Sequence, residues 1–213
     1  MGHTEAEIAS ILERYAAAGV SNILALRGDP PRDQPDYDHT RDTFPQAVDL
    51  VRFIKKFSGH PDKRGFGIGV AGFPEGHPAT PNRLLEMDYL KAKVDAGADY
   101  ICTQLFFDNH DFYDFRDRCA LAGIEAPIIP GIMPIISLKR LHRVLELTGE
   151  KEPSELARAL ASEDPNLAKS AGIEFAAKLV SDLVAGGVQA VHLYAFNEHK
   201  NVTEVLRRAK IVS

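Results

Sequence analysis

Short apolar runs alternate with amphipathic stretches along almost the whole chain. The apolar runs are rich in Ile, Val and Leu, as is typical of strands that are covered on both faces. In the stretches between them, apolar residues recur at helical spacing. This alternation predicts a parallel sheet with right-handed crossovers, although the pattern alone does not separate an open sheet from a closed barrel. Five strands are predicted, over residues 22–26, 65–71, 100–104, 128–132 and 190–195.

Capping residues mark where several helices begin. Thr4 and Glu7 have the spacing of a capping box, and Gly19 is expected to end the helix that follows. Asp164 and Pro165 open a later helix, because proline is favoured at the first helical position. Residues 32–42 are rich in Pro and Asp and predict a long loop. The other helices are expected near residues 45–57, 82–96, 111–122 and 138–147, after a Ser154 cap, and near 202–210.

The composition is that of an ordinary globular domain. The chain has 213 residues, of which 45% are apolar and 26% charged, so disorder is not expected. This length suits one domain over residues 1–213, slightly short of the roughly 250 residues of a complete (β/α)8 barrel. The net charge is −5 and no basic stretch is present, which argues against a nucleic-acid partner.

The two cysteines, Cys102 and Cys119, belong to no CxxC motif and no Cys/His cluster. Neither a zinc site nor a disulfide is therefore expected, and a reducing compartment fits best. The N-terminal segment lacks the apolar core of a signal peptide, and no apolar run reaches membrane-spanning length. We expect a cytoplasmic protein without a membrane partner.

Polar side chains follow most of the predicted strands. The carboxyl ends of parallel strands meet at one rim, where α/β folds bind their ligands. We therefore expect an active site at this rim. Its members are Arg27, Gly28 and Asp29 after the first strand, Phe73, Glu75 and His77 after the second, Gln104 at the third, and Asn197 and Glu198 after the fifth.

Several of these residues also have a simpler interpretation. Asp29 stands before two prolines and is compatible with a turn residue, and His77 with an ordinary surface loop. Lys93, on a predicted helix, would ordinarily be solvated. Gln104 is harder to explain in this way, because a buried amide without partners costs about 1–3 kcal/mol.

Three glycines, Gly65, Gly67 and Gly69, superficially resemble a nucleotide-binding loop. They lie within a predicted strand and no helix follows them directly, so the Rossmann fingerprint is not met. We interpret them as relieving crowding inside a barrel. The sequence has no P-loop, GxSxG or HExxH motif, and a hydrolase with a nucleophilic triad has no support.

Five segments in a fixed order carry a resemblance to a known family. They are LALRGDPP (24–31), FPEGHP (73–78), LKAKVDAGADYICTQLFFD (90–108), FRDRCALAGI (115–124) and IIPGIMPI (128–135). Together they span nearly the whole chain. In this order and approximate spacing they resemble methylenetetrahydrofolate reductase.

The resemblance implies an α/β fold of the (β/α)8 TIM-barrel type that carries non-covalent FAD. In this family NADH or NADPH reduces the flavin, which then reduces 5,10-methylenetetrahydrofolate to 5-methyltetrahydrofolate for methionine biosynthesis. The chain would supply about five of the eight βα units, corresponding to strands 4 to 8 of the family barrel. A folate is the implied substrate, and a homo-oligomer is left open.

The resemblance also assigns roles to individual residues. Asp29 and Gln104 match catalytic positions, Asp29 beside flavin and folate and Gln104 against the pterin or nicotinamide. Arg140 and Glu198, with Asp29 and Gln104, match positions that touch the substrate. No metal is implied. The flavin-contact positions are Arg27, Gly28, Asp29, Ala47, Phe73, His77, Thr80, Glu86, Tyr89, Ala92 and Lys93.

The chain departs from the family pattern at several of these positions. Phe73 stands where tyrosine is frequent and so lacks a hydroxyl donor, and Glu86 stands where aspartate is usual. Ala92 occupies a position that can be cationic. Glu198 replaces an arginine, which reverses the charge beside the expected folate site.

The family also has a Glu-Phe-Phe-Pro-Pro segment whose glutamate serves as general acid, and this chain does not contain it. A truncated or mis-started reading frame, a partial chain and completion by a partner chain are all compatible with this. Two functions therefore stay open: a flavin-dependent reductase, and a non-catalytic barrel subunit that binds a partner or ligand without turnover.

Overall fold

A computed structural model describes residues 2–31, 33–34, 36–78 and 80–212. Within this part of the chain, five strands form one sheet in the order β1-β2-β3-β4-β5. β1 pairs in parallel with β2, and β4 with β5. An α/β fold with five strands is thus confirmed. The strands are β1 (Asn22–Ala25), β2 (Gly67–Gly72), β3 (Tyr100–Leu105), β4 (Ile128–Ile132) and β5 (His192–Leu193).

Helices fill most of the chain between the strands. The first part holds α1 (Glu5–Ala17), the 3₁₀ helix η1 (His39–Arg41), α2 (Ala47–Lys56) and α3 (Arg83–Asp95). The later part holds α4 (Asn109–Leu121), α5 (Leu138–Thr148), α6 (Ser154–Leu160), α7 (Pro165–Ala185) and α8 (His199–Arg208).

The chain divides into two compact units that alternate along the sequence. Unit 1 comprises Met1–Gly72, Met87–Cys102 and Ala120–Ile128. Unit 2 comprises Phe73–Glu86, Thr103–Cys119 and Ile129–Ser213. The segment that directly follows β2 therefore belongs to unit 2, although β2 itself belongs to unit 1.

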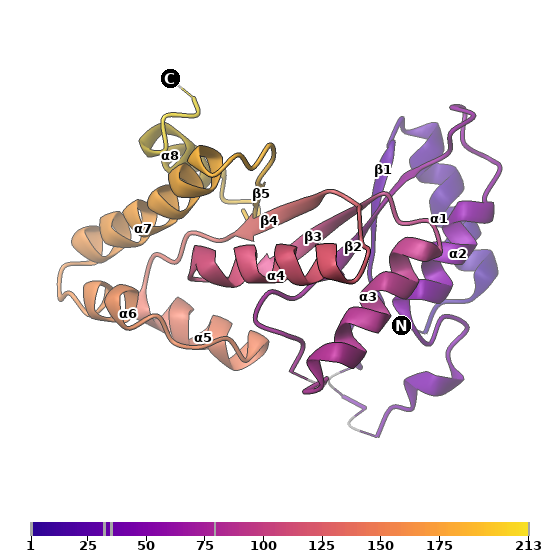
Figure 1. Cartoon of the computed structure of the whole chain (residues 1–213), viewed down its shortest axis with the longest axis horizontal. Coiled ribbons are helices and arrows are strands. Elements are labelled where there is room, and N and C mark those ends of the chain that lie inside the picture. The colour runs from indigo at the N-terminus through magenta and orange to yellow at the C-terminus, as the bar shows by residue number, and fades with distance from the viewer. Residues whose placement is uncertain (1, 32, 35, 79, 213) are drawn as a thin grey trace. The chain divides into compact units, whose positions relative to one another are not determined.

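Unit 1 is built on the β1–β2 pair. α1 begins at the predicted capping box: the Thr4 N–H donates to Glu7 Oε2 over 2.8 Å, and the Glu7 N–H donates to Thr4 Oγ1 over 3.3 Å. α2 packs on β1 and β2 and buries Val51 and Ile54 (Figure 1). This helix is amphipathic, so burial of one apolar face supplies its main stabilisation.

Close backbone approach explains one of the strand glycines of unit 1. A Cβ atom added at Gly69 would lie 2.4 Å from the ring of Tyr100. Only glycine leaves room for that ring on β2, which supports the interpretation that this glycine relieves crowding.

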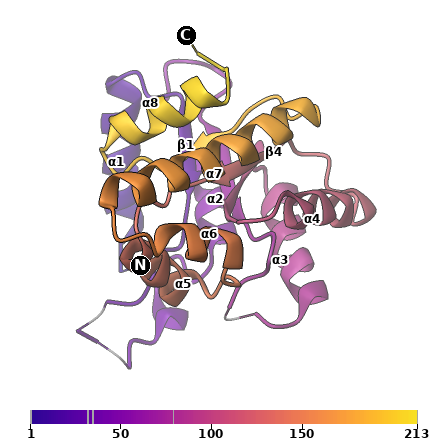
Figure 2. The same cartoon turned by 90° about the vertical axis from the view of Figure 1, so that its left-hand side faces the viewer.

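Unit 2 contains a stack of C-terminal helices. α7 contacts α6 on one side and α8 on the other, and both views show it running between them (Figures 1 and 2). Asp164 caps α7 by accepting from the Asn166 N–H over 2.8 Å, with Pro165 at the first helical position as predicted. An apolar core joins strands to α5, α6 and α7 through Leu105, Phe107, Met133, Ile135, Leu141, Val144, Leu156, Leu160 and Ala168.

Thr103 joins β3 to β4 and to the segment that follows β5. Its hydroxyl oxygen accepts from the Gly131 N–H on β4 over 2.8 Å. Its carbonyl oxygen accepts from the Tyr194 hydroxyl, just beyond β5, over 3.0 Å. Thr103 is fully buried, so these bonds satisfy polar groups that water does not reach.

Some predicted boundaries were wrong. The fifth strand was expected over residues 190–195 but spans only His192–Leu193, and the last helix begins at His199 rather than near residue 202. Ser154 is the first residue of α6, not its cap, which is Pro153. The predicted loop 32–42 contains η1, while Arg32 and Pro35 lie outside the described residues.

In the part of the chain that the structure describes, no helix combines the length and the apolar character that crossing a membrane requires.

Candidate functional site

The loop after β2 and the start of α3 bring together four of the predicted flavin-contact residues in unit 2. The rings of Phe73 and His77 meet edge to face, with centroids 4.7 Å apart. The His77 N–H donates to Glu86 Oε1 over 3.0 Å, and the His77 carbonyl accepts from the Thr80 N–H over 2.8 Å. Phe73, His77, Thr80 and Glu86 thus form one connected group, which we call the β2 loop cluster.

Glu86 has an unsatisfied carboxylate oxygen in this cluster. Its side chain is only 12% exposed, and Oε2 is buried without a hydrogen-bond partner among the described residues. This oxygen forms an ion pair with Arg83, whose NH1 lies 3.5 Å away, but accepts no hydrogen bond from any residue that the structure describes. Because a buried acceptor without a donor is costly, a ligand hydroxyl that donates to Oε2 would be stabilised here.

Lys93 of unit 1 is not a solvated helix lysine. Its ammonium donates to the carbonyl oxygen of Ala71 over 2.6 Å, at the end of β2. The side chain is half-buried. The fold therefore holds this positive charge beside the carboxyl end of β2.

The segment after β1 carries Arg27, Gly28 and Asp29, also in unit 1. Gly28 and Asp29 are exposed, and Arg27 is half-buried. The Arg27 Nε–H donates to the Gly28 carbonyl over 3.4 Å, one residue along the chain. Asp29 therefore presents its carboxylate to solvent.

The remaining predicted flavin positions lie on helices. Ala47 is the first residue of α2 and is half-buried. On α3, Ala92 is half-buried, whereas Tyr89 is 45% exposed. None of these three side chains carries a charge, so they could contact a flavin only through van der Waals surface or, for Tyr89, its hydroxyl.

Gln104 lies on the less buried face of β3. Burial alternates along this strand, and Tyr100, Cys102 and Gln104 share one face opposite the buried Ile101 and Thr103. Gln104 Oε1 accepts from the Leu105 N–H over 3.0 Å. The side chain is thus half-buried and held by its own strand.

Arg140 and Glu198, the two remaining residues predicted to contact the substrate, lie together in unit 2. Arg140 NH1 lies 3.6 Å from Glu198 Oε2, and the Arg140 guanidinium lies over the Phe196 ring, 5.4 Å from its centroid. Asn201 Nδ2 donates to the same Glu198 oxygen over 3.4 Å. The carboxylate of Glu198, which stands where the family pattern has an arginine, therefore pairs with the Arg140 guanidinium.

The candidate residues divide between the two units, so a single rim that unites them stays a prediction. Unit 1 holds Arg27, Gly28, Asp29, Ala47, Tyr89, Ala92 and Lys93. Unit 2 holds Phe73, His77, Thr80, Glu86, Gln104, Arg140 and Glu198.

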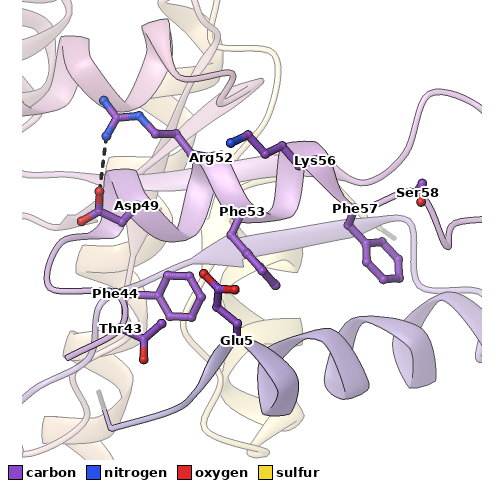
Figure 3. Close-up of a pocket in the computed structure, with 9 residues that line it drawn as sticks. All are labelled: Glu5, Thr43, Phe44, Asp49, Arg52, Phe53, Lys56, Phe57 and Ser58. Atoms are coloured by element: carbon purple, nitrogen blue, oxygen red, sulfur yellow. Dashed lines mark hydrogen bonds and ion pairs between the residues drawn. The ribbon is translucent and has the colours of Figure 1, made fainter.

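A hollow of about 530 Å³ in unit 1 includes none of the candidate residues. It lies between the start of α1 and α2, where Glu5, Phe44 and Phe53 point toward one another (Figure 3). The Phe44 and Phe53 rings meet edge to face at 5.2 Å, and Arg52 pairs with Asp49 at 3.3 Å. The cations and carboxylates around it largely offset one another, so it does not identify a ligand.

Comparison with known proteins decides the family. The family model described as methylenetetrahydrofolate reductase matches residues 1–210. The chain belongs to this family. It is 39% identical to "Methylenetetrahydrofolate reductase (NADH) 1" of Arabidopsis thaliana, over 94% of this chain and 35% of that protein. It is 37% identical to "Methylenetetrahydrofolate reductase 2" of Saccharomyces cerevisiae, over 94% of this chain and 34% of that protein.

This methylenetetrahydrofolate reductase family chain thus spans about a third of the length of the curated relatives it matches. Among solved structures, an uncharacterized protein from Clostridium thermocellum that binds two copies of 5-methyl-5,6,7,8-tetrahydrofolic acid has a similar fold. The TM-score is 0.52 at 16% identity, over 78% of this chain and 58% of that one. At this identity the likeness concerns the fold.

Proposed function

We propose that this chain forms the flavin- and folate-binding part of an enzyme that reduces 5,10-methylenetetrahydrofolate to 5-methyltetrahydrofolate. The observation that carries the proposal is the family match over residues 1–210. Relatives named for NADH and for NADPH both align with the chain, so either nucleotide is a candidate reductant. The proposal includes a cytoplasmic role in methionine biosynthesis.

The donor and acceptor groups of the chain suit FAD, which would carry hydride from the nicotinamide to the folate. Lys93 and Arg27 offer cations that can offset the charge of a diphosphate. Glu86 Oε2 lacks a hydrogen-bond donor within the described part of the chain, and a ribityl or ribose hydroxyl of FAD would supply one. His77 and Phe73 add an imidazole and an aromatic edge at the same loop.

Asp29 and Gln104 would act on the reacting groups. A carboxylate at Asp29 would favour positive charge on the activated folate. Gln104 would orient the pterin or the nicotinamide by hydrogen bonds from its half-buried amide. Arg140 would face the acidic tail of the folate, with its charge partly offset by Glu198.

The same family membership would give the five strands a place in a larger barrel. The five strands would be strands 4 to 8 of a (β/α)8 barrel, and residues 1–213 would form one partial barrel domain. The structural neighbour binds a methylated tetrahydrofolate, which supports a folate as the ligand. A homo-oligomer is compatible with this arrangement.

Flavin titration tests the cofactor assignment. We expect the purified chain to bind FAD, and Lys93→Met to weaken binding by about tenfold or more, since a charged hydrogen bond is worth about 1.5–3 kcal/mol. Lys91→Met is the matched control, because Lys91 on the same helix pairs with Asp95 at 2.9 Å. Equal affinities for both variants, or no binding by the unmodified chain, would contradict the proposal.

Reduction of bound FAD tests the catalytic assignment. NADH or NADPH should bleach the flavin absorbance, and 5,10-methylenetetrahydrofolate should reoxidise the reduced flavin and restore that absorbance. Asp29→Asn should slow reduction of 5,10-methylenetetrahydrofolate by about tenfold or more, because a carboxylate beside the activated folate stabilises its positive charge. Unchanged folate turnover in the Asp29→Asn variant would exclude the role of Asp29.

A second candidate is a binding subunit without turnover. The Arg140–Glu198 pair favours it, because the ion pair occupies the cation that would otherwise meet the folate. In that case the chain would bind a partner or ligand without turnover, and Asp29→Asn would change neither ligand affinity nor any activity.

A further inference from the structure

A carboxylate that the sequence prediction did not single out is buried at the end of α5. The helix ends at Thr148 and turns through Gly149, whose φ of 73° is left-handed. The next residue, Glu150, is only 8% exposed. Its Oε2 has no hydrogen-bond partner among the described residues. A buried carboxylate in this state is costly unless it is neutral or paired.

Glu150 faces acidic groups from two other segments of unit 2. Besides burial, the carboxyl groups of Glu75, in the β2 loop, and of Asp111, at the start of α4, both raise the pKa of Glu150. Arg83 at the start of α3 is the cation of the group. Burial, reinforced by Glu75, raises the pKa of Glu150 to about 9. Burial also raises the pKa of Asp111.

Backbone contacts show what this group joins. Glu75 Oε2 accepts from the Lys151 N–H over 3.2 Å. A Cβ atom added at Gly149 would lie 3.5 Å from Pro78, so the β2 loop lies against the turn that holds Glu150. From α4, Arg118 NH2 donates to the Pro74 carbonyl over 2.9 Å. Residues 74 and 75 are thus held from two sides, directly beside Phe73 and His77.

We propose that Glu150 and Glu75 form a carboxyl–carboxylate latch that fastens the β2 loop to the turn after α5. One proton, carried by Glu150, lets the two carboxyl groups share a hydrogen bond instead of repelling each other. Glu150 is then a positioning residue, which acts through Glu75 on Phe73 and His77. Its importance for the flavin rests on the proposed function, whereas the latch itself does not.

The latch makes folding stability depend on pH in a defined direction. Glu150 has a raised pKa in the folded state and an ordinary one, 4.5, in the unfolded state. Between these values the folded protein binds one more proton, so its stability falls as pH rises from about 4.5 to about 9. Above that range Glu150 ionises beside Glu75 and the latch opens.

Glu150→Gln isolates this effect, because glutamine keeps the size and a hydrogen-bond donor but cannot ionise. Urea unfolding is measured for both proteins between about pH 5 and about pH 9. The unfolding equilibrium constant of the unmodified chain, divided by that of Glu150→Gln, should rise by up to about tenfold per pH unit. Glu146→Gln is the matched control, since Glu146 on α5 is 68% exposed and pairs with Arg143. The stability of Glu146→Gln should depend on pH in the same way as that of the unmodified chain.

Hydrogen exchange locates the effect. Because intrinsic exchange rates are equal at a given pH, protection of residues 73–78 is compared between the unmodified chain and Glu150→Gln at about pH 4 and about pH 9.5. We expect equal protection at the lower pH and, at the higher pH, protection of the unmodified chain that is lower by about tenfold or more. Equal pH slopes of stability, or equal protection at both pH values, would overturn the latch. Neither readout uses FAD, so failure to bind flavin would not be mistaken for failure of the latch.

Discussion

The loops after β1 and β2 both carry predicted flavin contacts, but they are held differently. In the β2 loop, residues 73–77 are bonded to Glu86, to Arg118 of α4 and to the turn after α5. After β1, Gly28 and Asp29 are exposed, and Arg27 bonds to its neighbouring carbonyl. Contacts from three other segments thus set the geometry of the β2 loop, whereas Asp29 is exposed. We infer that ligand binding orders the β1 loop more than the β2 loop.

The largest expected effect comes from adding a methyl group to a glycine in each loop. Gly76 and Gly28 both have left-handed backbones, with φ of 99° and 83°. A Cβ at Gly76 would lie 1.7 Å from Arg83 NH1 and so displace the cation that faces Glu86. We expect Gly76→Ala to cost about 2 kcal/mol of unfolding free energy and Gly28→Ala about 1 kcal/mol, measured by urea unfolding. Equal costs would show that both loops are held alike.

A smaller effect is expected from the arginine that holds the β2 loop. Arg118→Met removes the bond to the Pro74 carbonyl and should cost about 1 kcal/mol. Arg116→Met is the matched control on the same helix, because Arg116 pairs with the neighbouring Asp117 at 3.2 Å and is 47% exposed. It should change stability by less than about 0.5 kcal/mol. Thermal unfolding of both variants checks this. Equal unfolding midpoints would show that the bond from Arg118 to Pro74 does not stabilise the β2 loop.

The smallest effect is expected at Asp29. Its exposed carboxylate should contribute little to folding, so Asp29→Asn should shift the unfolding free energy by less than about 0.5 kcal/mol. The same substitution is expected to impair folate reduction. A stability loss above about 1 kcal/mol in urea unfolding would mean that the fold, rather than a ligand, holds this residue.

Local signals in the sequence predicted much of the fold. The Thr4–Glu7 capping box and the Asp164–Pro165 start were confirmed, because each depends on residues a few positions apart. The fifth strand was predicted too long, because its length depends on pairing with β4. The observed register reaches only Gly131 with His192 and Ile132 with Leu193.

The candidate site was less predictable from the residues themselves. Gln104 and Asp29 stood out as polar residues at strand ends, but their roles came from the family resemblance. Glu150 gave no signal, since its partner Glu75 is distant in sequence and exposed glutamates are the rule near helix ends. The ion pair of Arg140 with Glu198 likewise joins separate segments, so only coordinates bring it out.

The Tyr194 hydroxyl reaches the Thr103 carbonyl across 91 residues of sequence, and β5 adds only two paired residues to β4. Closing so long a loop costs conformational entropy, and the hydrogen bonds of only two paired residues offset little of that cost. The strand around residue 193 should therefore dock late, after β3 and β4 have already formed. In kinetic terms, Tyr194→Phe should speed unfolding and leave the refolding rate unchanged; slower refolding would place this contact in the folding nucleus instead.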